Sequence, residues 1–201
     1  SPSETLLSLA DTRDEEIRRG LQTISTTGKG LLSFVESYRR FTRIPTPEPS
    51  LFYVKAFIDR MVELARHQNK CDNITFHIDI APADLIVYAD ENLISQVVIN
   101  LLKNAIEACE ESLSPQIVVE AVQKAGMVII SVIDNGSGIV PEAIDKVFVP
   151  FFTTKSKGSG IGLSLCRQIM NRHGGSISLD SQVEKGSSFV LRFPIVTKRI
   201  L

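Results

Sequence analysis

The sequence predicts an α+β fold, a two-layer α/β sandwich preceded by a long helix. The chain of 201 residues is 43% hydrophobic and 22% charged, so it can bury a substantial core. Its N-terminal part carries apolar residues at heptad spacing, which indicates a helix that packs along another helix. Beyond this part, segments with helical periodicity are interspersed with adjacent pairs of strand-like segments. This order favours a mostly antiparallel or mixed sheet that helices cover on one face.

The N-terminal part is predicted to form one helix from Glu15 to Phe41, about 40 Å long. Its apolar positions alternate spacings of four and three and are Ile17, Leu21, Ile24, Gly28, Leu31, Val35 and Tyr38. Ser3 to Ala10 would end a preceding helix, and Asp11 to Asp14 would supply the turn, so that residues 1–46 form a partial helical hairpin. An ordinary domain helix stays an alternative, because the heptad run is short for a coiled coil.

A proline-rich segment, Ile44-Pro-Thr-Pro-Glu-Pro49, marks the predicted domain boundary, because proline removes a backbone donor and disfavours helix in the residue before it. Residues 47–201 form the second predicted domain. Its expected helices are Val54–His67, Glu91–Glu110 and Gly160–His173. Its expected strands are Ile74–Ile80 paired with Leu85–Ala89, Ile117–Gln123 paired with Met127–Asp134, and Ser176–Ser181 with Ser188–Phe193.

The composition argues against several classes of protein. The net charge is −1 and the 22 basic residues are spread along the chain, which disfavours a nucleic-acid partner. No apolar stretch approaches the roughly 18 residues that cross a bilayer, and no signal peptide is recognisable, so no membrane contact is expected. Cys71, Cys109 and Cys166 lack metal-ligand spacing and are interpreted as reduced thiols. We therefore expect a cytoplasmic location, which a membrane-anchored parent protein would also allow.

A polar stripe follows one face of the helix expected after Asp90. Its members recur at intervals of three and four residues and are Gln96, Asn100, Lys103, Asn104 and Glu107. Two asparagines one turn apart are costly to leave unpaired where a helix meets a sheet. The stripe is therefore a candidate binding surface, with a solvated helix face as the alternative.

The strand that ends at Asp134 leads into Asn135-Gly-Ser-Gly138. Period-two alternation places Asp134 on the same face as Val128, Ile130 and Val132, so its carboxylate enters an apolar layer. A carboxylate there needs a hydrogen-bond donor, and the exocyclic amine of adenine is a suitable one. The glycines allow a sharp turn and the close approach of a ligand. A simple Asn-Gly turn is the alternative.

Residues 148–163 combine aromatic residues, lysines and glycines. Gly158-Ser-Gly-Ile-Gly-Leu163 opens a helix, where backbone amides and the helix dipole favour a phosphate, and Lys155 and Lys157 add positive charge. The run is not a P-loop, because no Gly-Lys-Ser/Thr closes it, and no strand leads directly into it as in a Rossmann turn. Phe-Val-Pro-Phe-Phe at 148–152 suggests a hinged lid anchored by aromatic residues, or else simple core packing.

Together these segments resemble, in order, the motifs of the histidine-kinase branch of the GHKL ATPase superfamily, whose other branches include gyrase, Hsp90 and MutL. The resemblance covers about Pro47 to Leu201. The five similar motifs are the N-box (Asn100-Leu-Leu-Lys-Asn104-Ala), the first G-box (Asp134–Gly138), the F-box (Phe148–Phe152), the second G-box (Gly158–Leu163) and the last G-box (Gly186-Ser-Ser-Phe189).

The resemblance implies the GHKL, or Bergerat, fold and the binding of ATP with Mg²⁺. It implies that Asn104 ligates Mg²⁺, that Asp134 selects adenine, and that Ser188 places a hydroxyl beside Asp134. Thr153 to Gly162 would form the ATP lid. The ATP-binding residues expected from it are Asn100, Lys103, Asn104, Asp134, Gly136, Gly138, Ile139, Thr154, Lys155, Lys157, Gly158, Ser159, Gly160, Ile161, Gly162, Leu163 and Ser188.

Position 100 distinguishes the branches of the superfamily. In the hydrolysing members a glutamate one turn before the magnesium-binding asparagine activates water, whereas Asn100 cannot act as a base at neutral pH. We therefore expect transfer of the γ-phosphoryl group to a protein side chain, a reaction that depends on positioning and charge neutralisation. Asn100 and Asn104 are the predicted catalytic residues.

The phosphoacceptor histidine of such a kinase is not recognisable. His67, His77 and His173 lie outside the His-Glu motif of the family's first hairpin helix, and His173, which precedes Gly174-Gly175, is expected to cap a helix. We expect the chain to begin beyond the acceptor, to bind nucleotide and to be unable to phosphorylate itself. The resemblance implies a parent protein that forms a homodimer through the hairpin and relays the phosphoryl group to a response-regulator receiver domain. The alternatives are a nucleotide-binding dimerisation module without kinase activity and a GHKL ATPase or serine kinase.

Overall fold

The computed structural model describes residues 15, 17–32, 35, 38–39, 44–69, 73–155 and 158–195. The chain divides into two compact units, residues 1–43 and residues 44–201. Ile44 already belongs to the buried core of the second unit. Among the described residues, no helix is both long and apolar enough to span a bilayer.

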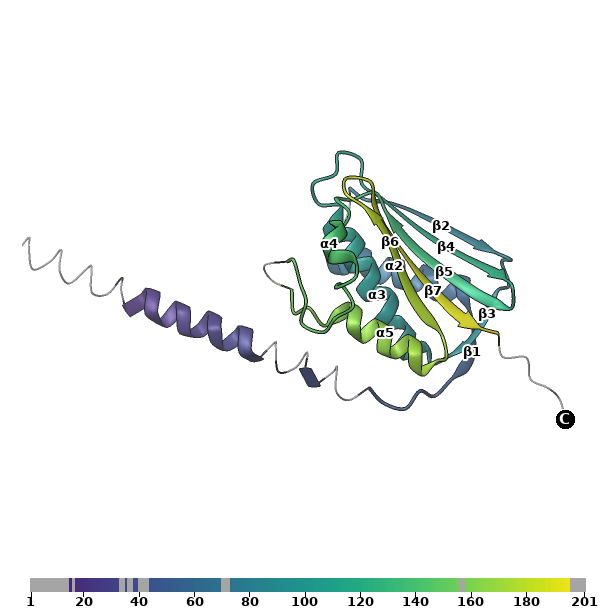
Figure 1. The fold of residues 1–201 in the computed structure, drawn as a ribbon, viewed down its shortest axis with the longest axis horizontal. Coiled ribbons are helices and arrows are strands. Elements are labelled where there is room, and N and C mark those ends of the chain that lie inside the picture. The colour runs from purple at the N-terminus through teal and green to yellow at the C-terminus, as the bar shows by residue number, and fades with distance from the viewer. Residues whose placement is uncertain are drawn as a thin grey trace, which may run out of the picture. The chain divides into compact units, whose positions relative to one another are not determined.

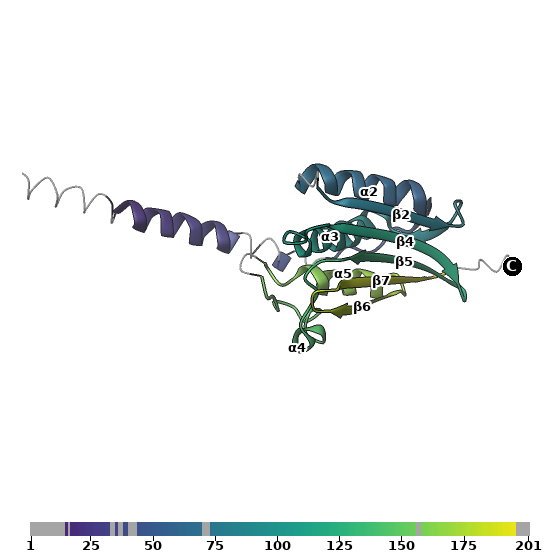
Figure 2. The same ribbon diagram turned by 90° about the horizontal axis from the view of Figure 1, so that it is seen from above.

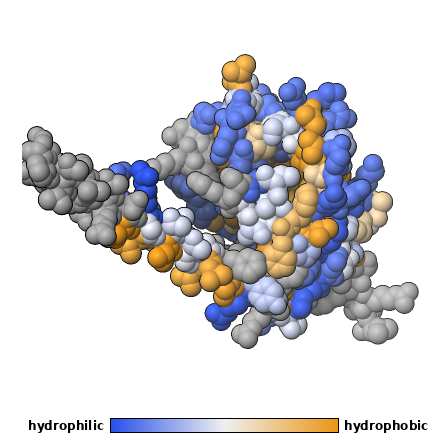
Figure 3. Space-filling view, turned by 60° about the vertical axis from the view of Figure 1, so that its left-hand side comes forward, coloured by the Kyte–Doolittle hydropathy of each residue, from blue (hydrophilic) through white to orange (hydrophobic). Residues whose placement is uncertain are grey.

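The first unit is helical at each of its described residues, 15, 17–32, 35, 38 and 39. Arg19 lies 3.1 Å from Glu15 one turn earlier, a pairing that supports an exposed helix. The apolar heptad positions are on the surface, with exposed fractions from 46% to 70%: Ile17, Leu21, Ile24, Leu31, Val35 and Tyr38 (Figure 3). The predicted helix is therefore present in these residues, whereas the hairpin turn predicted before it lies outside the described part of the chain.

A five-stranded mixed sheet forms one layer of the second unit, and helices on one of its faces form the other (Figures 1 and 2). The strand order is β2-β4-β5-β7-β6, with β2 parallel to β4 and the other neighbours antiparallel. The bounds are β1 (Ser50–Tyr53), α2 (Val54–Asn69), β2 (Thr75–Ala81), β3 (Ile86–Ala89), α3 (Glu91–Ala108), β4 (Gln116–Lys124), β5 (Met127–Asp134), α4 (Pro141–Ile144), α5 (Gly162–Arg172), β6 (Ser176–Gln182) and β7 (Gly186–Pro194). This architecture confirms the predicted fold class.

The core lies between α3 and the middle strands of the sheet. Alternate residues of β5 point towards the helices and are buried, as period two requires: Val128, Ile130, Val132 and Asp134. From α3, Ile94, Leu101 and Leu102 are fully buried. Because α3 packs against the sheet along its apolar side, the helix cannot rotate about its axis, and the side to which its polar stripe points is fixed.

The expected pairing of Ile74–Ile80 with Leu85–Ala89 is wrong. β2 instead pairs with β4, and β3 pairs with β1, a strand that the sequence patterns did not predict. The small β1–β3 sheet has its own buried side, where Phe52 lies opposite Val87 and the Phe52 ring is 5.0 Å from that of Phe57 on α2. Helix α4, which begins with Pro141 at its first turn, was also not predicted.

Candidate functional site

Hydrogen bonds join the polar residues of four segments: α3, the end of β5, the predicted lid and the start of β7. Asp134 lies at the carboxyl end of β5 and is 4% exposed. Its Oδ1 accepts hydrogen bonds from the amides of Gly136 at 2.9 Å and Ser187 at 3.2 Å. Among the described residues, both of these hydrogen bonds go to Oδ1, so Oδ2 is the oxygen that can accept a hydrogen bond from a ligand.

Burial raises the pKa of the Asp134 carboxyl above its ordinary value. The amides of Gly136 and Ser187 and the positive charge of Lys155 act in the opposite direction but do not offset the desolvation. A carboxylate kept in an apolar layer gains more than a solvated one from a ligand that donates a hydrogen bond to it. Its environment is therefore that of a recognition group.

Ser187, and not Ser188, lies beside Asp134, so the implied position of the Ser188 hydroxyl is wrong. In the β5–β7 ladder Ser187 is opposite Asp134 and Ser188 is opposite Ile133, and successive side chains of a strand point to opposite faces. Ser187 is buried, and its hydroxyl lies 3.0 Å from that of Ser181. Any contact of Ser188 with a nucleotide stays a prediction.

The turn after Asp134 is fixed at both ends. The amide of Ser137 donates to the last-turn carbonyl of Ala108 on α3 at 3.0 Å, and the amide of Ile139 donates to Ser181 Oγ at 2.9 Å. Gly138 has a φ of +68°, and a side chain there would run into the backbone carbonyl of Gln182. The backbone of the predicted first G-box is thus held close to both α3 and the β6–β7 turn.

Asn100 faces α5 rather than open solvent. Its Nδ2 donates to Cys166 Sγ at 3.3 Å, and its side-chain oxygen fills the space that a Cβ at Gly162 would need. Burial raises the pKa of the Cys166 thiol to about 12, although the bond from Asn100 lowers it. This part of the polar stripe is therefore packed against the start of α5, which rules out a simply solvated face.

Farther along α3 the stripe meets the predicted lid. Lys155 Nζ donates to Asn104 Oδ1 at 3.1 Å and forms an ion pair with Glu107. Lys103 Nζ lies 3.8 Å from the other carboxylate oxygen of Glu107. The structure thus brings Lys103, Asn104 and Lys155 together. It adds Glu107, a member of the polar stripe outside the predicted ATP-binding set.

The three phenylalanines beside the predicted lid differ in burial, and Phe152 is half-buried. Phe148 is buried, and the Arg167 guanidinium lies 4.1 Å from its ring centroid. Phe151 is 44% exposed, and its amide donates to the carbonyl of Gly160 at 2.8 Å, which closes the base of the loop. Of the other predicted residues here, Thr154, Gly158 and Ser159 are exposed, Ile161 is buried, Leu163 packs against the core, and Lys157 lies outside the described residues.

The N-terminus of α3 is tied to the C-terminus of α5. Asp90 Oδ1 caps α3 by accepting from two of its first amides, and the Asp90 amide donates to His173 Nε2 at 3.1 Å. Burial raises the pKa of Asp90, but hydrogen bonds from the backbone amides of Glu48, Leu93 and Asn92 outweigh it and lower the pKa. His173 is the C-cap residue of α5, as the sequence predicts.

Residues 89–197 match the protein family described as histidine kinase-, DNA gyrase B- and HSP90-like ATPase. The chain belongs to this family. The matched range contains α3, the turn after Asp134, the predicted lid and β7, so it holds the whole of the site.

Relatives in this ATPase family include named histidine kinases. Sporulation kinase D of Bacillus subtilis (strain 168) is 39% identical over 111 residues, which cover 55% of this chain and 22% of that protein. The catalytic domain of histidine kinase ThkA superposes with a TM-score of 0.66 at 36% identity, covering 73% of this chain and 95% of that one. ThkA in complex with response regulator protein TrrA superposes with a TM-score of 0.72 at 31% identity, covering 88% and 50%. The chain spans about a quarter of the length of the curated relatives it matches.

The oxygen donors of the candidate site fit Mg²⁺ that arrives with a nucleotide. In the described part of the chain, no group of three or more His, Cys, Asp or Glu side chains could hold a metal by itself. Mg²⁺ typically binds one or two protein oxygens and completes its coordination with phosphate and water. Asn104 Oδ1 is an oxygen of that kind, beside the basic side chains of Lys103 and Lys155.

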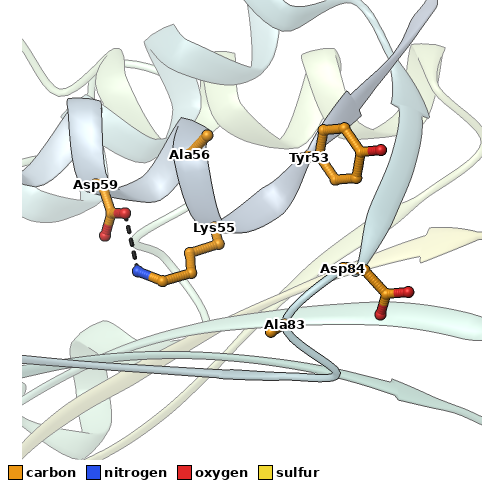
Figure 4. Close-up of a pocket in the computed structure, with 6 residues that line it drawn as sticks. All are labelled: Tyr53, Lys55, Ala56, Asp59, Ala83 and Asp84. Carbon is orange, nitrogen blue, oxygen red and sulfur yellow. Dashed lines mark hydrogen bonds and ion pairs between the residues drawn. The ribbon is translucent and has the colours of Figure 1, made fainter.

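A shallow hollow of about 460 Å³ lies elsewhere in the second unit. The residues around it come from the β1–α2 junction and the β2–β3 turn and are Tyr53, Lys55, Ala56, Asp59, Ala83 and Asp84 (Figure 4). Lys55 and Asp59 form an ion pair of 2.9 Å along α2. None of these residues belongs to the predicted ATP-binding set, so the hollow is not part of the candidate site.

Proposed function

We propose that this chain is the ATP-binding catalytic part of a protein-histidine kinase. In this proposal it transfers the γ-phosphoryl group of ATP to a histidine of the longer parent protein, for relay to an aspartate of a response regulator. Membership of the ATPase family and the names of its relatives support the nucleotide and the reaction class. The complex of ThkA with TrrA supports the kind of partner.

The chain's own residues would divide the work between the two parts of ATP. Asp134 would accept a hydrogen bond from the adenine amine through Oδ2, because Oδ1 already binds two backbone amides. Lys103 and Lys155 would bind the phosphates, and Asn104 would hold Mg²⁺. When bound, Mg²⁺ would neutralise charge on the phosphates during transfer. The amides of the predicted lid would orient the same groups.

The observation that carries the choice of kinase over hydrolase is the side chain at position 100. Asn100 is an amide fixed between Cys166 and Gly162, and an amide cannot take a proton from water at neutral pH. A site without this base favours a protein acceptor over hydrolysis. The exposed apolar stripe of the first unit supports assigning that unit to a helical hairpin through which the parent protein forms a dimer.

Phosphate labelling tests this proposal. The full-length protein is incubated with Mg²⁺ and ATP labelled at the γ-phosphate, and the stability of the protein-bound label is measured. Phosphohistidine gives label that acid removes and alkali does not, and Asn104→Ala should abolish it. Asn92→Ala, an exposed position of the same helix outside the polar stripe, should keep the label. Label that alkali removes, or no label at all in the wild type, would overturn the histidine-kinase assignment.

A further inference from the structure

Glu107 lies between two lysines, and each lysine faces a different oxygen of its carboxylate. Lys155 pairs with Oε2, and Lys103 lies 3.8 Å from Oε1. The Lys103 contact is within one helix, but the Lys155 contact joins α3 to a segment 48 residues farther along the chain. The same Lys155 ammonium also donates to Asn104 Oδ1.

Glu107 is the fixed member of this group. Its side chain is 31% exposed, compared with 46% for Lys155 and 61% for Lys103. It stands in the last two turns of α3, whose other face is buried in the core, so its backbone is held in place. Lys155, in contrast, extends from a loop, and its amide is held by the side chain of Thr153 at 3.0 Å.

We propose that Glu107 is a positioning residue of the nucleotide site, and this inference rests on the proposed function. Its carboxylate holds Lys155 against Asn104 when no nucleotide is bound and competes with the nucleotide phosphates for both lysines. A carboxylate and a phosphate are alternative oxyanion partners for the same ammonium groups. Nucleotide binding therefore includes an exchange, in which the lysines leave one anion of the protein for another on the ligand.

The contact with Asn104 adds a second element of competition. Lys155 donates to Oδ1 of Asn104, the oxygen that would bind Mg²⁺ in the proposed function. Two cations at one small oxygen repel each other, so Mg²⁺ and the Lys155 ammonium disfavour each other there. Glu107 strengthens the position of Lys155 because it holds the ammonium at this place through an ion pair.

The direction in which a substitution changes nucleotide affinity separates this role from direct ligand binding. A residue that contacts the nucleotide or its metal weakens binding when it is removed, whereas a competitor strengthens it. Partly exposed ion pairs are weak, so Glu107→Gln is expected to tighten Mg-ADP binding by about two- to fivefold. Glu110→Gln is the matched control, because it removes the same charge from an exposed position just beyond α3 and should change affinity much less.

Calorimetric titration of Mg-ADP into the two glutamine variants and into Lys155→Met tests the proposal. The double variant of Glu107→Gln with Lys155→Met completes the set. The gain in Mg-ADP affinity from Glu107→Gln should be smaller in the Lys155→Met background, because the competition acts largely through that lysine. Unchanged or weaker binding in Glu107→Gln would overturn the inference, as would an equal gain in Glu110→Gln. If Asn104→Ala and Asp134→Asn still weaken binding while Glu107→Gln has no effect, the proposed function survives and this inference fails.

Amide exchange in the nucleotide-free protein gives a readout that needs no ligand. Glu107→Gln removes the ion pair that joins the predicted lid to α3, so the hydrogen-bonded amides of Phe151, Lys155 and Gly158 should exchange faster. Glu110→Gln should leave these rates at the wild-type values. Equal rates in the wild type and in Glu107→Gln would contradict the holding role, whatever the outcome of the nucleotide titrations.

Discussion

Asp134 and Asn104 have opposite kinds of surroundings within one candidate site. Asp134 is buried at the end of a central strand, and its partners are backbone amides of Gly136 and Ser187. Asn104 is only partly buried, and its partner is the side chain of Lys155, which is also paired with Glu107. We call these the Asp134 region, with Gly136 and Ser187, and the Asn104 region, with Lys103, Glu107 and Lys155.

The difference shows which part of the site folding itself builds. The amides around Asp134 are set by the β5–β7 ladder and by a turn bonded to α3, so ordering them costs a ligand little. The charges around Asn104 are held by partly exposed ion pairs worth about 0–1 kcal/mol each, which a phosphate can replace. One region is preorganised for recognition, and the other is able to rearrange when a charged ligand binds.

The largest expected effect is at the Asn104 region. Asn104→Ala should weaken Mg-ADP binding about ten- to hundredfold, the scale typical of groups that hold or orient a metal. Binding of ADP without Mg²⁺ should change far less, and the free energy of unfolding should stay within about 0.5 kcal/mol because the residue is partly exposed. Calorimetry with and without Mg²⁺, together with urea unfolding, measures this. An equal loss in both titrations would show that Asn104 acts on the nucleotide itself.

A comparison of two neighbouring serines tests the rigidity of the Asp134 region. Ser187→Ala removes a buried hydroxyl that bonds to Ser181, so it should lower the free energy of unfolding by about 1 kcal/mol. Ser188→Ala, on the other face of β7, should change it by less than about 0.5 kcal/mol. Urea titrations of the two variants measure the difference. The reverse order of the two effects would mean that the register of β7 is wrong.

The pH dependence of stability is a finer probe of the same region. Burial raises the pKa of Asp134, so its folded-state pKa exceeds its unfolded value and the folded state binds the proton more tightly. The stability this provides is present below the unfolded pKa, near 4, and is lost as the pH rises through the raised folded pKa. Wild type should therefore lose stability relative to Asp134→Asn over this rise. Urea unfolding of both proteins from pH 4 to pH 8 measures this difference in the free energy of unfolding. If the wild type instead became more stable relative to Asp134→Asn as the pH rises, the raised pKa of Asp134 would be contradicted.

Sequence periodicity was sufficient to predict which side chains of a single strand or helix face the core. The period of two in β5 predicted that Asp134 faces the core with Val128, Ile130 and Val132. The same period in β7 could have identified Ser187 as the neighbour of Asp134, because Phe189, Leu191 and Phe193 share its parity and are buried. The Ser188 assignment failed because it followed the motif rather than this alternation.

Features that depend on contacts between distant elements could not be predicted in the same way. The sequence indicated β2 and β3 as strands but not their partners, since β2 joins β4 and β3 joins β1 through tertiary packing. Glu107 was visible in the polar stripe, but its pairing with Lys155 depends on where the predicted lid folds back. The contact of Phe148 with Arg167 beside that lid depends on where α5 packs.

The most direct test of the account is calorimetric titration of Mg-ADP into the chain and its Asp134→Asn variant. The asparagine would use its oxygen for the amides of Gly136 and Ser187 and would turn its NH₂ group towards the adenine amine, placing donor against donor. Asp180→Asn, at an exposed position on the outer face of β6, is the matched control. We expect Mg-ADP to bind the wild type and Asp180→Asn with similar affinity, and to bind Asp134→Asn at least about tenfold more weakly. Equal affinity in Asp134→Asn and the wild type would contradict it.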